Sequence, residues 1–92
     1  MEFEWHLKKA IYNLRKHRVS FEEASSVFND VLATVYEDPD HSAHEKRYLI
    51  VGTSAQGRLL NVSFADRGQR IRIISARKVT RREKKSYEEE ER

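Results

Sequence analysis

The residues of this sequence that could do chemistry are mostly arginine and lysine, and they gather near its C-terminal end. Nine basic side chains lie between Arg67 and Lys85, against a single acid, Glu83. The planar fork of an arginine can bond two phosphate oxygens at once, so such a cluster fits an anionic partner. The alternative is a solvated basic surface with no ligand, and charge alone does not separate the two.

The reaction class open to these side chains is narrow. The sequence has no cysteine, no Gly-x-Ser-x-Gly motif and no glycine-rich phosphate loop, so the common nucleophile and nucleotide-binding motifs are absent. Lys, Arg, His, Tyr and Glu suit the metal-independent cleavage of RNA, in which a 2′-OH attacks the adjacent phosphate. That reaction needs a base, a proton donor and cations that stabilise the charge on phosphorus.

The first predicted helix carries further candidates. His17 ends this helix, where an imidazole either transfers protons near neutral pH or complements the helix dipole. Lys9, Asn13 and Lys16 are spaced to share one helix face, which we expect to be exposed. That face is either a binding surface or simply solvated.

The residues around the only proline include candidate metal ligands. Their carboxylates and imidazoles are groups that can bind a divalent cation. The residues are Asp38, Asp40, His41, His44 and Glu45. A loop between strands is commonly rich in Asp, Ser and His because those residues suit turns. The sequence therefore predicts a turn, and neither a metal nor another cofactor is assigned.

Composition places the chain in a broad class. Its 92 residues make one domain, residues 1–92. The absence of cysteine fits a reducing compartment, and no apolar run approaches the roughly 20 residues of a membrane span. The start, "MEFEWH", lacks the apolar core of a signal peptide. We expect a soluble cytosolic domain without a membrane partner.

Three helices are predicted. "HLKKAIYNLRKH" has the spacing of one buried apolar stripe, formed by Leu7, Ala10, Ile11 and Leu14. In the second helix, Ser20 can cap the start and Glu23 takes the reciprocal position of a capping box. In the third, Thr80 and Glu83 take the same two positions. This last helix has almost no apolar stripe, so it either protrudes or needs a partner.

The strands follow a period of two. A short strand over residues 1–5 precedes the helices, and four more are predicted from "VLATVYE", "KRYLIVG", "GRLLNVSFAD" and "QRIRIISARK". In the last of these, adjacent isoleucines break the alternation, and a β-bulge there would bring Ser75 and Arg77 onto the face that carries Arg70 and Arg72. The order β-α-α-β-β-β-β-α predicts an α+β fold, with two N-terminal helices packed on one face of an antiparallel sheet and a C-terminal helix.

The motifs together resemble those of a known family. "KHRVSFEEA" at residues 16–24, "DPDHS" at 38–42, "GRLL" at 57–60 and "ISARK" at 74–78 resemble the BrnT-type toxins of bacterial type II toxin–antitoxin systems. The likeness runs over nearly the whole chain. Two positions depart from the family pattern: His6 stands where Asp is usual, and Arg18 where Gly is usual. At the second position an arginine costs about 1 kcal/mol if φ is positive.

The resemblance implies a RelE/ParE-like fold and a ribonuclease that inhibits translation in the bacterial cytoplasm. It also implies a BrnA-type antitoxin, through which alone the complex would bind DNA. RNA is the expected substrate, and the ribosome is left open as a further partner. The alternative function is a non-enzymatic regulator that binds nucleic acid through the same basic face.

The site predicted on this basis combines the sequence candidates with the family motif. Arg77, the arginine of "ISAR", and Arg67 would clamp the scissile phosphate. Lys9 would add positive charge, and His17 or Glu45 would move protons. The remaining cations expected to contact RNA are Lys16, Arg47, Arg58, Arg70, Arg72, Lys78 and Arg81.

Overall fold

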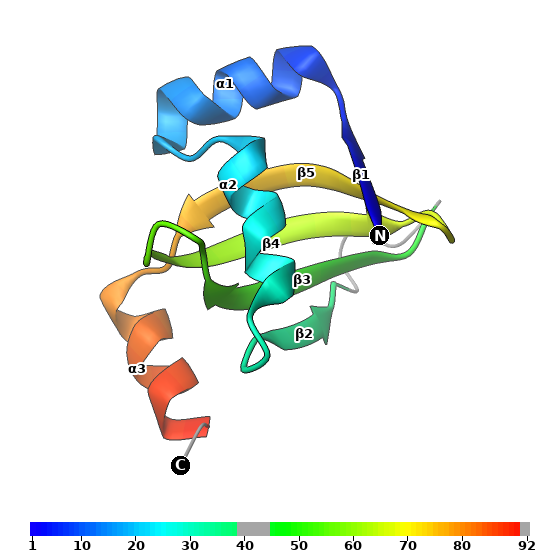
Figure 1. Cartoon of the computed structure of the whole chain (residues 1–92). Helices are drawn as coiled ribbons and strands as arrows, with labels where there is room; N and C mark the ends of the chain where they lie inside the picture. The colour runs from blue at the N-terminus through cyan, green and yellow to red at the C-terminus, as the bar shows by residue number, and fades with distance from the viewer. Residues whose placement is uncertain (39–44, 91–92) are drawn as a thin grey trace.

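The computed structural model describes residues 1–38 and 45–90 and has the predicted order of elements (Figure 1). The elements are β1 (Glu2–Trp5), α1 (Leu7–His17), α2 (Phe21–Ser26), the 3-10 turn η1 (Val27–Asn29), β2 (Thr34–Glu37), β3 (Arg47–Thr53), β4 (Leu59–Asp66), β5 (Arg70–Lys78) and α3 (Arg81–Glu90). Within these residues, no helix is long and apolar enough to cross a membrane.

The five strands form one sheet in the order β1-β5-β4-β3-β2. Strands β2 to β5 make the predicted antiparallel meander, and this part of the prediction is confirmed. The first strand, β1, instead pairs in parallel with β5, so the sheet is mixed. Parallel neighbours need a long connection, and here all the intervening elements supply it.

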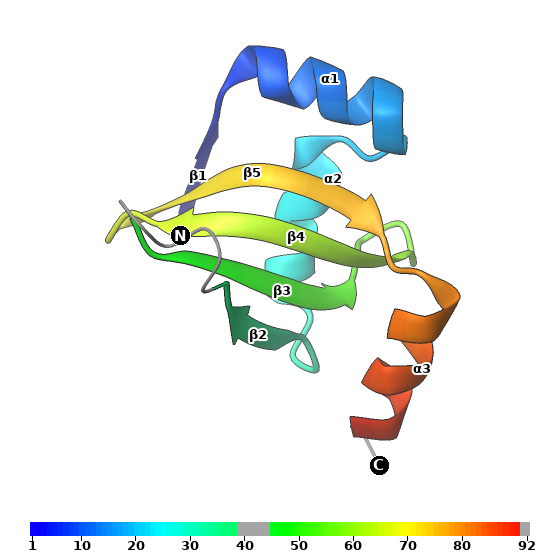
Figure 2. The ribbon, with the colours of Figure 1, turned by 180° about the vertical axis from the view of Figure 1, so that it is seen from behind.

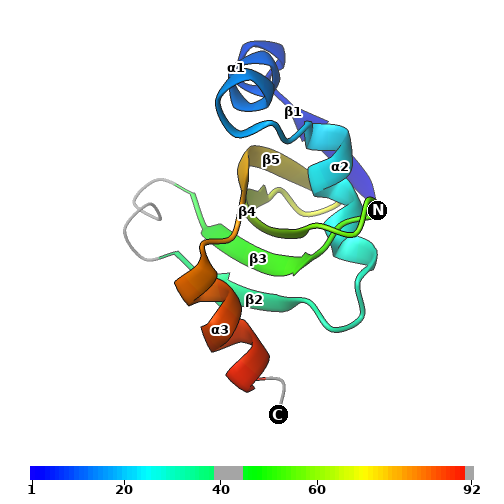
Figure 3. The same ribbon diagram turned by 90° about the vertical axis from the view of Figure 1, so that its left-hand side faces the viewer.

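The hydrophobic core fills the space between the sheet and the segment from Val19 to η1. Helix α2 crosses one face of the sheet, and α3 lies on the other side (Figures 1 and 3). Phe28 joins the two layers, with its ring 5.1 Å from that of Phe3 and 5.0 Å from that of Phe64. Trp5 packs edge-on against Phe21 at 5.9 Å. Phe3 and Trp5 thus belong to the core packing, as their apolar character predicts.

Helix α1 is oriented differently from the prediction. Its apolar stripe is not buried: Leu7, Ile11 and Leu14 are 69%, 46% and 49% exposed. The residue of α1 that is buried is Asn13, at 3%, and its predicted place on an exposed face is wrong. The helix lies beyond the β5 edge, where the backbone beside it needs polar partners rather than apolar ones.

Asn13 supplies those partners. Its Nδ2 donates to the carbonyl oxygens of Ala76, at 2.7 Å, and of Val19, at 2.9 Å, and its Oδ1 accepts from the Ala76 N–H at 3.0 Å. Strand β1 pairs with β5 only as far as Ile73. The carboxamide of Asn13 therefore continues the pairing of the β5 edge with a side chain, and it fixes α1 to the sheet.

Replacing Asn13 by alanine is expected to lower the free energy of unfolding by about 2 kcal/mol, because three backbone groups lose their partner where water has little access. Denaturant unfolding monitored by circular dichroism measures the change. Lys8→Ala, on the exposed side of α1, is the matched control and is expected to stay within about 0.5 kcal/mol of the wild type. Equal stability of the two variants would contradict this role for Asn13.

The ends of the helices explain the two unusual residues. His6 precedes α1 at the N-cap and makes no side-chain capping bond. Arg18 follows α1 with φ of 59°, in the left-handed region, so the strain expected at this position is present. Ser20 caps α2 by accepting from the Glu23 N–H at 3.0 Å. The capping box also predicts a hydrogen bond from the Ser20 backbone N–H to the Glu23 carboxylate. This bond is not formed, because the carboxylate binds Arg58 and Ser54 instead.

Candidate functional site

One face of the sheet is left open by α2 (Figure 2). Side chains alternate along a strand, so the neighbours of the buried residues Ile50, Val62 and Ile73 point to this side. We call it the open face. Its main members are Arg47, Leu49, Val51, Asn61, Ser63, Arg72, Ser75 and Arg77.

A β-bulge sets which β5 residues reach the open face. Ser75 pairs with Ser63, whereas Ile73 pairs with Phe64, so Ile74 is the additional residue. The bulge predicted at the adjacent isoleucines is confirmed. Because of it, Ser75 and Arg77 lie on the same face as Arg72.

Three arginines share one carboxylate at one end of the open face. Arg72 Nη2 donates a hydrogen bond to Oε1 of Glu45. Arg47 Nε lies 3.4 Å from the same oxygen, and Arg67 Nη1 lies 3.8 Å from Oε2. We call these four residues the Glu45 cluster. Its side chains are between 27% and 49% exposed, so solvent and a ligand both have access.

A hollow of about 250 Å³ adjoins this cluster on the open face. Its lining combines a guanidinium, a carboxylate and two hydroxyls with apolar side chains, and consists of Asp38, Arg47, Leu49, Ser63, Ile74 and Ser75. The hydroxyls of Ser63 and Ser75 come from directly paired positions. This arrangement places a guanidinium and two hydroxyl donors beside one carboxylate within one concave surface, and the donors suit a phosphate group.

Arg77 lies further along the open face and is bound to α3. Its Nη1 and Nη2 donate to the two oxygens of Glu83, at 2.7 Å and 2.8 Å. Glu83 also accepts from the Thr80 N–H at 2.8 Å, while Thr80 Oγ1 accepts from the Glu83 N–H at 3.1 Å. The capping box predicted for this helix is therefore confirmed. Tyr87 adds a hydrogen bond to the Leu32 carbonyl at 2.8 Å, so α3 is attached at both ends.

The pair with Arg77 makes the stability of the α3 attachment depend on pH. Hydrogen bonding to Arg77 lowers the pKa of Glu83 from 4.5 to about 2. A carboxyl with a depressed folded-state pKa stabilises the fold above its unfolded value, and this contribution is lost as pH falls through the folded value. Because both side chains are partly exposed, screening reduces the effect to about 1 kcal/mol.

We therefore expect Glu83→Gln to be less stable than the wild type by about 1 kcal/mol near pH 6, with the difference disappearing as the pH falls towards 2. Thermal unfolding of both proteins across this range measures it. Glu88→Gln, at an exposed position of the same helix, controls for the lost charge and should show no such convergence. A difference between Glu83→Gln and the wild type that is independent of pH would contradict the assignment.

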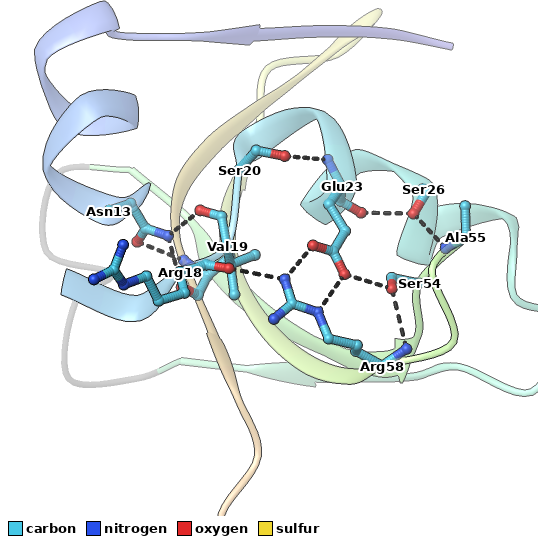
Figure 4. Close-up of polar contacts among 10 residues, drawn as sticks. Asn13, Arg18, Val19, Ser20, Glu23, Ser26, Ser54, Ala55 and Arg58 are labelled. Atoms are coloured by element: carbon cyan, nitrogen blue, oxygen red, sulfur yellow. Dashed lines mark hydrogen bonds and ion pairs between the residues drawn. The ribbon is translucent and has the colours of Figure 1, made fainter. Parts of the chain in front are cut away.

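Arg58 holds parts of the fold together through its guanidinium. Its Nε donates to Glu23 at 2.8 Å, and its Nη2 bonds to the same carboxylate and to the Arg18 carbonyl (Figure 4). Ser54 Oγ also donates to Glu23, at 2.7 Å. Glu23 is 6% exposed, and hydrogen bonding to Arg58 holds the pKa of this carboxyl below its ordinary value. These contacts join the start of α2 to the β3–β4 turn. The Arg58 guanidinium therefore lies away from the open face.

The other predicted cations are spread over the surface. Lys78 pairs with Leu60, a core residue, and so lies on the opposite side of the sheet from Arg77. Arg70 is on the open face, with Nε 3.3 Å from Glu2. Arg81 begins α3 and is exposed. Arg67 and Arg77 bind different carboxylates, Glu45 and Glu83, and the two guanidiniums do not converge on one point.

The α1 candidates lie apart from the Glu45 cluster. Lys9 and Lys16 are exposed and His17 is half-buried, and Lys16 Nζ lies 5.6 Å from the centre of the Tyr12 ring. No contact in the described part of the chain joins these three side chains to the cluster. Of the metal candidates, Asp40, His41 and His44 lie outside the described residues. Residues 1–38 and 45–90 contain no group of three or more His, Asp or Glu placed to hold a metal ion.

Fold and site together define an α+β domain with a cluster of arginines on the sheet face opposite α2. The chain belongs to the BrnT family, because residues 5–83 match the family described as the ribonuclease toxin BrnT of type II toxin–antitoxin systems. It is thus a member of a ribonuclease toxin family whose systems pair a toxin with an antitoxin.

A solved structure supports the fold. The crystal structure of the ribonuclease toxin BrnT from Brucella abortus is similar to this chain, with a TM-score of 0.67 and 20% sequence identity. The match covers 88% of this chain and 99% of the Brucella chain. No match was found among curated proteins.

Proposed function

We propose that this chain cleaves RNA without a metal ion, by attack of a 2′-OH on the adjacent phosphate, and that it inhibits translation in this way in the bacterial cytoplasm. The observation that carries the proposal is the convergence of Arg47, Arg67 and Arg72 on Glu45, at a partly exposed place on the sheet face opposite α2. A phosphate group carries negative charge that attracts these guanidiniums. It also brings oxygens for the guanidinium forks.

The cluster supplies the base and the cations that the reaction needs. Arg72 and Arg47 bind the scissile phosphate and stabilise the charge that develops on phosphorus. Glu45 accepts the proton of the attacking 2′-OH. The new bond joins O2′ to phosphorus, the bond to O5′ breaks, and the leaving oxygen takes a proton from water, which reaches this open face. The products are a 2′,3′-cyclic phosphate and a 5′-OH end.

The remaining cations extend the RNA path. Arg67, more exposed at the rim of the cluster, and Arg77, further along the open face, bind phosphates on either side of the scissile one. Ser63 and Ser75, between them, donate hydroxyl hydrogen bonds. Lys9, Lys16 and His17 on α1 meet RNA that runs past the β5 edge. Arg58 is left out of the RNA path because Glu23 already binds its guanidinium.

A BrnA-type antitoxin is the proposed partner. An acidic segment of such a protein would cover cations of the toxin and compete with RNA, because both ligands are anionic. Binding of DNA would pass through the antitoxin alone.

The test is cleavage of single-stranded RNA by the purified chain in the presence of EDTA. We expect cleavage to continue and to leave cyclic phosphate ends, and expression of the chain alone to arrest bacterial growth. Binding should weaken with salt, by a slope of about 0.7 per neutralised phosphate. RNA that is bound but never cut would point to the non-enzymatic regulator, and cleavage that EDTA stops and Mg²⁺ restores would overturn the metal-free mechanism.

A further inference from the structure

An apolar groove lies between α1 and the start of α2, on the far side of the molecule from the chemistry proposed above. It has a volume of about 190 Å³. One wall of the groove is formed by four α1 side chains, those of Leu7, Ala10, Ile11 and Leu14. Its floor is formed by two aromatic residues, Trp5 and Phe21. We call it the α1 groove. The rings of Trp5 and Phe21 meet edge-on at the base of the groove.

The exposure of this stripe is unusual for a helix that has a sheet beside it. Leu7, Ile11 and Leu14 follow the i, i+4, i+7 spacing of a core-facing stripe, yet each is close to half exposed or more. Asn13 decides this, since its bonds to Ala76 and Val19 turn another side of α1 to the sheet. A row of large apolar side chains left exposed and bordered by polar residues marks an interaction surface.

The charges around the groove define what fits there. Helix α1 has four lysines and arginines and no carboxylate. Lys8 and Arg15 stand three residues before and four residues after Ile11, so both border the stripe on its outer side. Glu22 is the acid at the opposite rim. A partner helix with apolar residues at helical spacing and carboxylates facing the α1 side would match both features.

We infer that the α1 groove is the docking site for an acidic amphipathic helix of the antitoxin. This inference rests on the antitoxin partnership of the proposed function and adds the surface that carries it. The stripe from Leu7 to Leu14 covers two helical turns, or about 10 Å, which receives two or three apolar anchors of a partner helix. The groove is separate from the Glu45 cluster, but it lies on α1, whose Lys9, Lys16 and His17 belong to the proposed RNA path. An antitoxin helix bound there would therefore compete with RNA outside the cluster.

The experiment titrates the purified antitoxin of the same toxin–antitoxin locus into the full-length toxin by calorimetry. The double variant Ile11→Asp, Leu14→Asp is expected to lose about 100-fold in affinity, since it places charge where apolar anchors should pack. RNA cleavage and the thermal midpoint should stay at the wild-type level. Val31→Asp, at an apolar position 95% exposed elsewhere, is the matched control and should bind normally.

A second variant tests the inference even if the first one unfolds. Lys8→Glu, Arg15→Glu leaves the apolar stripe in place and is expected to bind the antitoxin about 10-fold more weakly, with most of the loss at low salt. Wild-type affinity in both double variants, or in the charge variant alone if the apolar one unfolds, would overturn the inference. So would a toxin that sediments as a dimer through this stripe, because a second copy would then occupy the groove. Failure of the ribonuclease proposal would appear separately, as no cleavage by the wild type.

Discussion

Replacing Arg72 by alanine is expected to lower the rate of RNA cleavage about 1,000-fold, the upper range for removing a group that stabilises transition-state charge. Arg72 is hydrogen-bonded to Glu45 and pairs with Ala65 of β4. Its loss removes a fork from the phosphate and a partner from the carboxylate. Cleavage of a labelled RNA under single-turnover conditions measures the effect, and growth after induction should recover in parallel.

The control for Arg72 is Arg15→Ala, which removes the same charge from exposed α1 and should leave the cleavage rate within about 3-fold of the wild type. The Arg72 variant should stay folded, because the side chain is partly exposed and Glu45 keeps Arg47 and Arg67. A folded Arg72→Ala protein that cleaves RNA at the wild-type rate would place the reaction elsewhere on the surface.

Arg77→Lys is expected to lose about 100-fold in cleavage while RNA binding falls only a few-fold, because the neighbouring phosphate stays bound but the scissile phosphate is misplaced. The two Nη groups of Arg77 bind Glu83, which leaves the Nε edge of the fork for a phosphate. Lysine keeps the charge but cannot bind a carboxylate and a phosphate in this fixed geometry. Comparing kcat with the affinity for an uncleavable 2′-deoxy RNA analogue separates the two effects.

Glu83→Gln tests whether the pair positions Arg77. If Glu83 only orients the guanidinium, the glutamine variant should keep most of the RNA affinity and lose about 10-fold in kcat. Arg77→Ala should lose at least as much activity as Arg77→Lys and retain antitoxin binding. A folded alanine variant with undiminished toxicity at matched expression would show that Arg77 serves only to attach α3.

The strands and their faces could be predicted because they depend on local pattern. The alternation in "QRIRIISARK" and its break at two adjacent isoleucines were enough to predict the bulge and to put Ser75 and Arg77 beside Arg72. The caps of Ser20 and Thr80 are equally local. Such features involve residues a few positions apart, so the sequence contains all their determinants.

The partners of charged residues were harder to predict. Arg58 and Arg72 look alike in the sequence, yet Glu23 binds one and Glu45 the other, across 35 and 27 positions of the chain. The first pair is part of the packing of α2, and the second lies on the open face. Only the pairing of β3 with β4 and of β4 with β5 separates them in space.

The sequence by itself determined the element order, the antiparallel meander, the basic character of β5 and the family. The tertiary structure alone decided which side of α1 meets the sheet. Helical periodicity identifies the apolar stripe but not the surface against which it packs. Here the unpaired backbone groups at the edge of β5 require hydrogen-bond partners, which a carboxamide supplies and an apolar side chain does not. Burying Asn13 satisfies that backbone, and it leaves Leu7, Ile11 and Leu14 exposed because one helix cannot turn both sides to the same strand.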